Sequence, residues 1–151
     1  MLALLLALHL IAAVFWVGGM AFAYLVLRPA AGPLEAPARL SLWRRVFGIF
    51  LPWVGVSIAV LLISGYVMVL VYFGGFAGMQ IYIHVMQGLG IIMVLLFGHL
   101  VFAPWRRFRA AVGESAWPEA GKQLGQIRKI VAINLALGVV TLLAGGTGRY
   151  W

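Results

Sequence analysis

The 151-residue chain contains no cysteine and no aspartate, and it has only three glutamates. Without cysteine it cannot form a disulfide, a thiolate metal site, an iron–sulfur cluster or a covalently attached haem. The glutamates, Glu35, Glu114 and Glu119, all fall outside the long apolar stretches, so the membrane interior has no carboxylate for a proton relay or an ion-coupled transporter. Any bound metal must therefore use histidine, methionine or oxygen ligands.

Charged residues are also scarce, at 9% of the chain, whereas 65% of the residues are hydrophobic. That leaves too little polar surface to cover a soluble globule of this size. Each of four apolar stretches can cross a hydrocarbon core that needs roughly 20 helical residues. They predict an all-α integral membrane four-helix bundle, a single transmembrane domain with spans at Leu2 to Leu27, Val46 to Phe73, Met79 to Ala103 and Ile130 to Gly146.

The first stretch does not have the features of a secretion signal. It lacks a basic segment at its start, and it is longer than the 7 to 15 apolar residues typical of such signals. It then continues directly into Arg28 and Pro29. We therefore expect it to be retained as a helix.

The net charge of +8 is explained by the placement of the basic residues. Arginine and lysine cluster in the predicted loops 28–45 and 104–129, and the loop near 74–78 has none. The positive-inside rule therefore predicts that both basic loops are cytoplasmic and both termini periplasmic, in a multi-pass protein of the bacterial inner membrane. This distribution favours contact with a lipid bilayer and argues against nucleic acid as a partner.

The second basic loop is long enough to hold structure of its own. Ser115, Pro118 and Glu119 have the pattern of a helix start, which predicts a short interfacial helix leading into the last span. A solvated basic linker is the alternative. The two halves of the chain also resemble each other, because an offset of 75 relates His9 to His84 and Pro29 to Pro104. A duplicated two-helix hairpin would explain this offset, although apolar sequences also match by chance.

All three histidines lie within predicted spans, where ionisable groups are rare and usually functional. His9 precedes Arg28 by 19 positions and His84 precedes Arg106 by 22, so both should lie roughly 28 to 33 Å from the basic boundary. Two imidazoles at one depth on two helices are what axial ligation of a b-type haem requires, and copper could use the same pair. The alternative is that each histidine only hydrogen-bonds a neighbouring helix.

His99 lies 15 residues after His84, roughly 22 Å further along an ideal helix, so it cannot join the same site. It could hydrogen-bond Asn134, line a quinone pocket or act as a lone axial ligand. Arg149 follows the last span and could pair with a haem propionate, or it could anchor the helix at the interface. Met20, Met79 and Met86 could add thioether ligands for Cu(I) beside His9 and His84, although ordinary packing also explains methionines.

The sequence also resembles a known family. His9-Leu10-Ile11, Phe15 through Gly19 and Leu27-Arg28-Pro29 resemble the first helix of the copper resistance protein D (CopD) superfamily. The similarity continues through Tyr82-Ile83-His84, Phe97-Gly98-His99 and Arg128 through Asn134. The chain is also similar to small haem-binding bacterial protoporphyrinogen oxidases, whose two histidines would correspond to His9 and to His84 or His99. Those enzymes have a lysine where this chain has Met86.

These resemblances imply three alternative functions. The first is a haem-b-binding membrane protein that exchanges electrons with membrane quinone and uses His9 and His84 as axial ligands. Such a protein could be an oxidoreductase or an electron carrier. The second is a copper-handling membrane protein that uses His9, His84 and nearby methionines. The third is a cofactor-free accessory subunit of a larger respiratory or copper-handling complex. The sequence leads us to expect the haem protein first.

Overall fold

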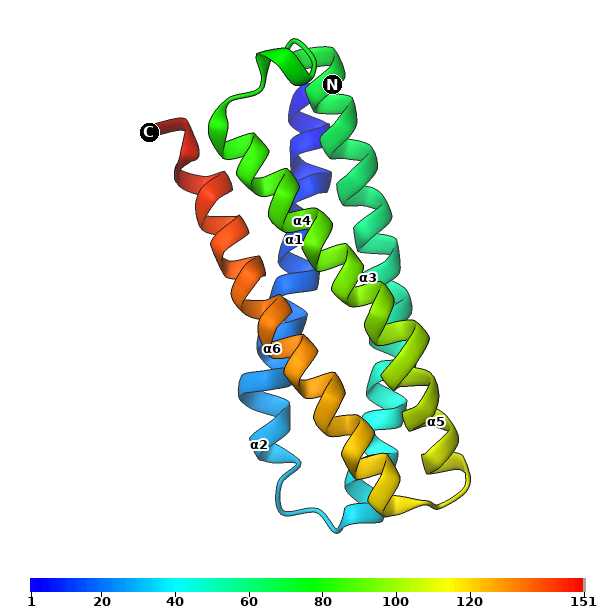
Figure 1. Cartoon of the computed structure of the whole chain (residues 1–151). Coiled ribbons are helices and arrows are strands. Elements are labelled where there is room, and N and C mark those ends of the chain that lie inside the picture. Colours follow the sequence, from blue (N-terminus) through cyan, green and yellow to red (C-terminus); the bar gives the residue numbers. More distant parts are fainter. Residues whose placement is uncertain (151) are drawn as a thin grey trace.

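A computed structural model describes residues 1–150, except for the side chain of Arg149, and shows four long helices packed as an antiparallel bundle (Figure 1). No strand occurs among these residues. The predicted all-α four-helix membrane architecture is therefore confirmed. The elements are α1 (Leu2–Phe22), η1 (Ala23–Leu27), α2 (Arg28–Ala30), α3 (Ala36–Tyr72), η2 (Phe76–Gly78), α4 (Ile81–Leu100), η3 (Val101–Trp105), α5 (Arg106–Gly113), α6 (Trp117–Thr147) and η4 (Gly148–Tyr150).

The helices extend well beyond the predicted spans, and most of the two predicted basic loops is helical. Helix α3 begins at Ala36 and α6 at Trp117, each with a proline in its first turn, where the missing N–H of proline costs nothing. The interfacial helix expected before the last span is the continuous first part of α6. Helix α3 has 37 residues, about 55 Å at 1.5 Å per residue, so it exceeds a hydrocarbon core of about 30 Å.

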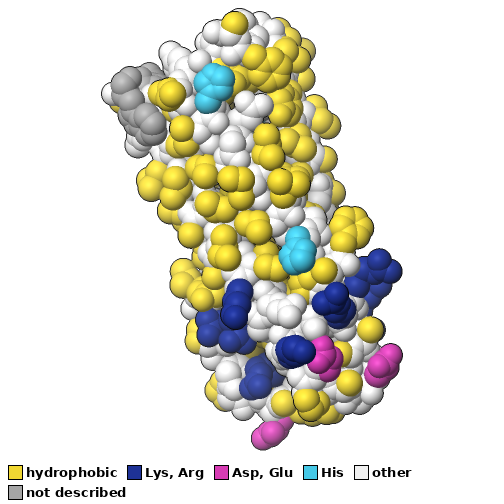
Figure 2. Space-filling model, viewed as in Figure 1, with side chains coloured by type: hydrophobic (Ala, Val, Ile, Leu, Met, Phe, Trp, Pro, Cys, Tyr) yellow, Lys and Arg dark blue, Asp and Glu magenta, His cyan; other side chains and the backbone are white. Residues whose placement is uncertain are grey.

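The extra helical length builds a packed layer at the basic end of the bundle. Leu40, Trp43 and Phe47 recur on one face of α3 and are buried. They pack with Trp105 and Phe108, whose rings lie 6.0 Å apart, and with buried residues of α5 and α6. Basic and acidic side chains gather on the outside of this layer, whereas hydrophobic side chains dominate the rest of the visible face (Figure 2). Both termini lie at the opposite end (Figure 1).

A second core fills the middle of the bundle. Trp16, Val17 and Met20 of α1 pack there against Val54 of α3 and Met93 of α4. Gly138 of α6 lies against this core, because a Cβ atom at Gly138 would come within 2.8 Å of Val17 Cγ2 and 3.2 Å of Met93 Cε. The absence of a side chain at this position therefore lets three helices approach closely.

The first and third spans contain the same irregularity. Each changes from α-helix to one π-helical turn near a proline: η1 ends just before Pro29, and η3 contains Pro104. Proline cannot donate the i to i−4 hydrogen bond, so a widened turn near it is expected. Helix α1 packs mainly on α3, and α4 on α6, which forms two hairpins. This shared design agrees with a duplicated hairpin.

The connection between the hairpins depends on two glycines. Gly74 and Gly75 both have φ of 75°, a conformation that side chains disfavour. The Gly75 N–H donates to the Val69 carbonyl at 2.9 Å, which satisfies a group left free at the end of α3. This turn joins the end of α3 to the connection that leads into α4.

Candidate metal site

His9 is held against α3 by a hydrogen bond to Ser64. The His9 side chain is half-buried, and its Nδ1 lies 2.9 Å from Ser64 Oγ. Gly65 leaves room for the ring, since a Cβ atom there would lie 3.3 Å from His9 Cε1. Ser64 Oγ in turn donates to the Val60 carbonyl at 2.6 Å. A chain of hydrogen bonds therefore fixes the imidazole between two helices of the first hairpin.

These contacts favour one tautomer of His9. A serine hydroxyl has one hydrogen, and when Ser64 donates it to the Val60 carbonyl, its oxygen can accept only from an Nδ1–H of His9. The neutral ring then has an unprotonated Nε2 with a free lone pair. Metal-binding histidines commonly donate their other ring N–H to a neighbouring acceptor in this way. His9 is therefore prepared to act as a metal ligand through Nε2.

His84 and His99 have different surroundings. Both side chains are exposed on α4, and no interaction of either one with His9 occurs among the described residues. Gln87, one turn after His84, donates from Nε2 to the Tyr66 hydroxyl at 3.1 Å and so joins α4 to α3. The described residues also contain no group of three or more histidines and carboxylates that could hold a metal. Of the three histidines, His9 is thus the one whose imidazole is oriented by a hydrogen bond among the described residues, and its pairing with His84 stays a prediction.

Asn134 corrects one expectation about His99. The predicted hydrogen bond between these residues is absent, because Asn134 Nδ2 donates to the Met93 carbonyl at 3.3 Å. Asn134 is buried in the bundle while His99 points outward, so a similar depth along the bundle did not place them together. Asn134 Oδ1 is buried and has no hydrogen-bond partner among the described residues.

Two of the predicted methionine ligands also lie apart from His9. Met20 is 11 residues further along the same helix, about 16 Å at 1.5 Å per residue, and is buried in the middle core. Met86 packs on α6, where a Cβ atom at Gly145 would lie 3.1 Å from Met86 Sδ. The structure therefore does not bring His9, Met20 and Met86 into one site.

Met86 instead belongs to a seven-residue repeat of methionines, Met79, Met86 and Met93, that the sequence analysis did not recognise. Met86 and Met93 lie on one side of α4, about 10.5 Å apart, whereas Met79 precedes this helix in extended backbone. Met86 and Met93 face glycines of α6, and Thr141 Oγ1 lies 3.9 Å from Met93 Sδ. Met93 shares the middle core with Met20. The seven-residue spacing was the available signal for this row.

Arg149, the predicted partner of a haem propionate, has its side chain outside the described part of the structure. The pairing of Arg149 with a haem propionate therefore stays a prediction.

Comparison with known proteins identifies the family. No curated protein and no solved structure matches the chain. The model of the family copper resistance protein D matches residues 44–147, more than half of the chain. The matched region includes His84, His99 and the methionine row, whereas His9 precedes it. The chain also has four helices that are long and apolar enough to cross a membrane. It is therefore a multi-pass membrane protein that belongs to the copper resistance protein D family.

Proposed function

We propose that this protein handles copper within the inner membrane and that His9 binds Cu(I) there through Nε2. The family match carries the proposal, since the description of that family concerns copper. The hydrogen bonds that leave His9 Nε2 free support it chemically. Imidazole and thioether groups both suit copper, and this chain has no thiolate that could compete. The copper-handling function thus replaces haem-dependent electron transfer as our leading interpretation.

The charge distribution gives the site an orientation. The basic end of the bundle faces the cytoplasm in this proposal, because cytoplasmic segments are enriched in lysine and arginine. Both termini lie at the other end, which is then periplasmic (Figure 1). His9, near the start of α1, would meet copper that arrives from the periplasm.

The methionine row offers copper a path from this end toward the middle of the bundle. Met86 and Met93 are about 10.5 Å apart along α4 and pack against different glycines of α6, so their thioethers lie at separate depths, and Met79 precedes the helix. They would therefore contact Cu(I) in succession. The row ends in the core that Met93 shares with Met20. Methionine is flexible enough to change its rotamer around a passing ion.

Replacing His9 by alanine tests this function. We expect His9→Ala to weaken Cu(I) binding at least tenfold, since it removes the oriented imidazole ligand. Binding is measured on purified protein in detergent by competition with a chromophoric Cu(I) chelator. His99→Ala is the matched control, because His99 is an exposed histidine of α4 outside the proposed path. Equal Cu(I) affinity in His9→Ala and the unaltered protein would contradict the assignment.

The same His9 Nε2 could ligate haem iron, which makes haem b the second candidate. An absorption spectrum of the purified protein separates the two candidates. Copper handling predicts no Soret band and measurable Cu(I) binding. A Soret band with stoichiometric iron that disappears in His9→Ala would overturn the copper proposal in favour of a cytochrome. A protein that binds neither group and co-purifies with a larger complex would be an accessory subunit.

A further inference from the structure

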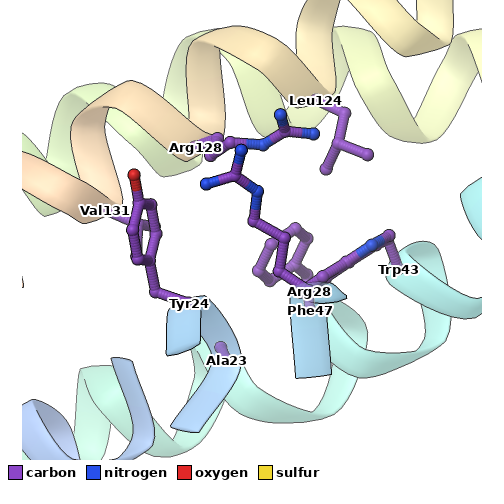
Figure 3. Close-up of a pocket in the computed structure, with 8 residues that line it drawn as sticks. All are labelled: Ala23, Tyr24, Arg28, Trp43, Phe47, Leu124, Arg128 and Val131. Atoms are coloured by element: carbon purple, nitrogen blue, oxygen red, sulfur yellow. The ribbon is translucent and has the colours of Figure 1, made fainter. Parts of the chain in front are cut away.

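Two arginines from distant parts of the sequence converge at the basic end of the bundle. Arg28 belongs to α2, and Arg128 lies one hundred positions later on α6. Figure 3 shows their guanidinium groups next to each other at a pocket that both residues line. Ala23, Tyr24, Trp43, Phe47, Leu124 and Val131 form the rest of its lining. The pocket is thus an almost wholly apolar hollow with two cations at its edge.

No carboxylate neutralises these arginines among the described residues. Glu119 contacts Lys122 at 3.9 Å and accepts a hydrogen bond from Gln123 at 2.6 Å. Glu35 and Glu114 lie exposed in the short connections and form no ion pair there. Arg39 adds to the positive charge near Arg128, while its own guanidinium donates to the carbonyls of Gly32 and Leu34. The pocket therefore has a net positive potential with no internal counterion.

The position of Arg28 is set by packing. Its guanidinium carbon lies 5.1 Å from the centre of the Tyr24 ring, within the range of a cation–π contact. Arg28 is half-buried, so water screens its charge less than that of Arg128 or of the arginines of α5, all of which are exposed. Two like charges that lie next to each other repel, and an anion between them would relieve that repulsion. The planar forks of two arginines match the oxygens of a phosphate group.

We propose that this pocket binds the phosphate group of an anionic phospholipid. The pocket lies between η1, α2, α3 and α6, where the apolar spans give way to the basic end of the bundle, and this is the depth at which a lipid phosphate would meet the membrane surface. The hollow holds only about 30 Å³, so the phosphate would lie at its mouth beside the two guanidinium groups, and the acyl chains would lie along the exposed apolar surface of the spans. Free phosphate needs no such apolar surface. Anionic lipids are available on the cytoplasmic side, where basic segments attract them. This site is independent of the proposed copper function.

Native mass spectrometry of the detergent-solubilised protein with added phosphatidylglycerol tests the proposal. The double variant Arg28→Gln/Arg128→Gln should lower the bound fraction about tenfold, because it removes two charge-assisted phosphate contacts. Arg107→Gln/Arg109→Gln is the matched control, since it removes the same charge from exposed positions of α5. We expect less than a twofold change in this control. An equal loss in both double variants would overturn the proposal, because binding would then follow net charge alone.

A second measurement on otherwise unaltered protein covers the case in which the double variant does not fold. Brominated phosphatidylglycerol should quench the fluorescence of the protein more than that of Trp43→Phe, since Trp43 lines the pocket. Brominated phosphatidylcholine should not distinguish the two proteins. Equal quenching by both lipids would contradict selective binding of an anionic lipid. Displacement of phosphatidylglycerol by millimolar inorganic phosphate would instead identify a site for free phosphate and overturn the lipid assignment.

Discussion

Ser64→Ala is expected to weaken Cu(I) binding about 10- to 100-fold without removing any proposed ligand, the range found when the partner of a metal-bound histidine is lost. Ser64 Oγ lies 2.9 Å from His9 Nδ1, and in the tautomer that we propose it accepts the Nδ1 hydrogen, which fixes the orientation of the ring and leaves Nε2 free. Alanine would leave the ring free to rotate or to exchange tautomers. The affinity is measured with the chelator competition used for His9→Ala.

Ser57→Ala provides a closely matched control for Ser64→Ala. Ser57 lies seven residues earlier on the same helix, is also buried, and also donates to the carbonyl four residues before it, at 3.0 Å. It has no histidine partner among the described side chains. Ser57→Ala should therefore retain Cu(I) affinity. If both serine variants lost affinity equally, the effect would come from α3 as a whole, and the proposed orientation of His9 by Ser64 would be wrong.

Gly138→Leu should destabilise the bundle by about 3 kcal/mol, the upper range for overpacking a core. Even the Cβ atom would lie 2.8 Å from Val17 Cγ2 and 3.2 Å from Met93 Cε, so α6 must move away from two neighbouring helices. The free energy of unfolding can be measured by titrating mixed micelles with a denaturing detergent while following helix content.

Gly18→Leu is the control for this variant. Gly18 is also a glycine within a membrane-spanning helix, but a Cβ atom there would meet nothing within 4 Å. The same chemical change at Gly18 should therefore alter the free energy of unfolding by less than about 0.5 kcal/mol. A similar destabilisation in both variants would show that leucine disturbs helix insertion generally, and that close packing at Gly138 is not the cause.

The length and hydrophobicity of the four apolar stretches were sufficient to predict the bundle, because few other structures satisfy the backbone in lipid. The extent of the helices was underestimated, since basic residues were assigned to loops. Leu40, Trp43 and Phe47 in fact carry helical periodicity through the first basic segment. A periodicity test that ignored charge would have found the layer at the basic end.

The candidate site was predictable only in part. The depth of a residue in the membrane can be estimated by counting residues from the basic boundary, and this count predicted that His9 and His84 lie at a similar depth. The direction of a side chain around its helix depends on which neighbours the helix packs against. His9 therefore contacts Ser64 across the first hairpin, and Asn134 contacts Met93, whereas the sequence gives no sign of either pairing. Met20 could have been separated from His9 by the rise of the helix alone.

The π-helical turns of η1 and η3 have a consequence for how the chain can change. A π turn holds one more residue than an α turn, so five residues of it rotate the chain about as far as four residues of α-helix. Arg28 follows one such turn, and Phe108 follows the other. Removing a single residue from either turn would therefore restore a regular helix and leave the segment beyond it facing nearly the same direction. One-residue deletions there should keep Arg28 beside Arg128 and Phe108 in its core, whereas the same deletion within the regular part of α1 or α4 would rotate everything beyond it by about 100°.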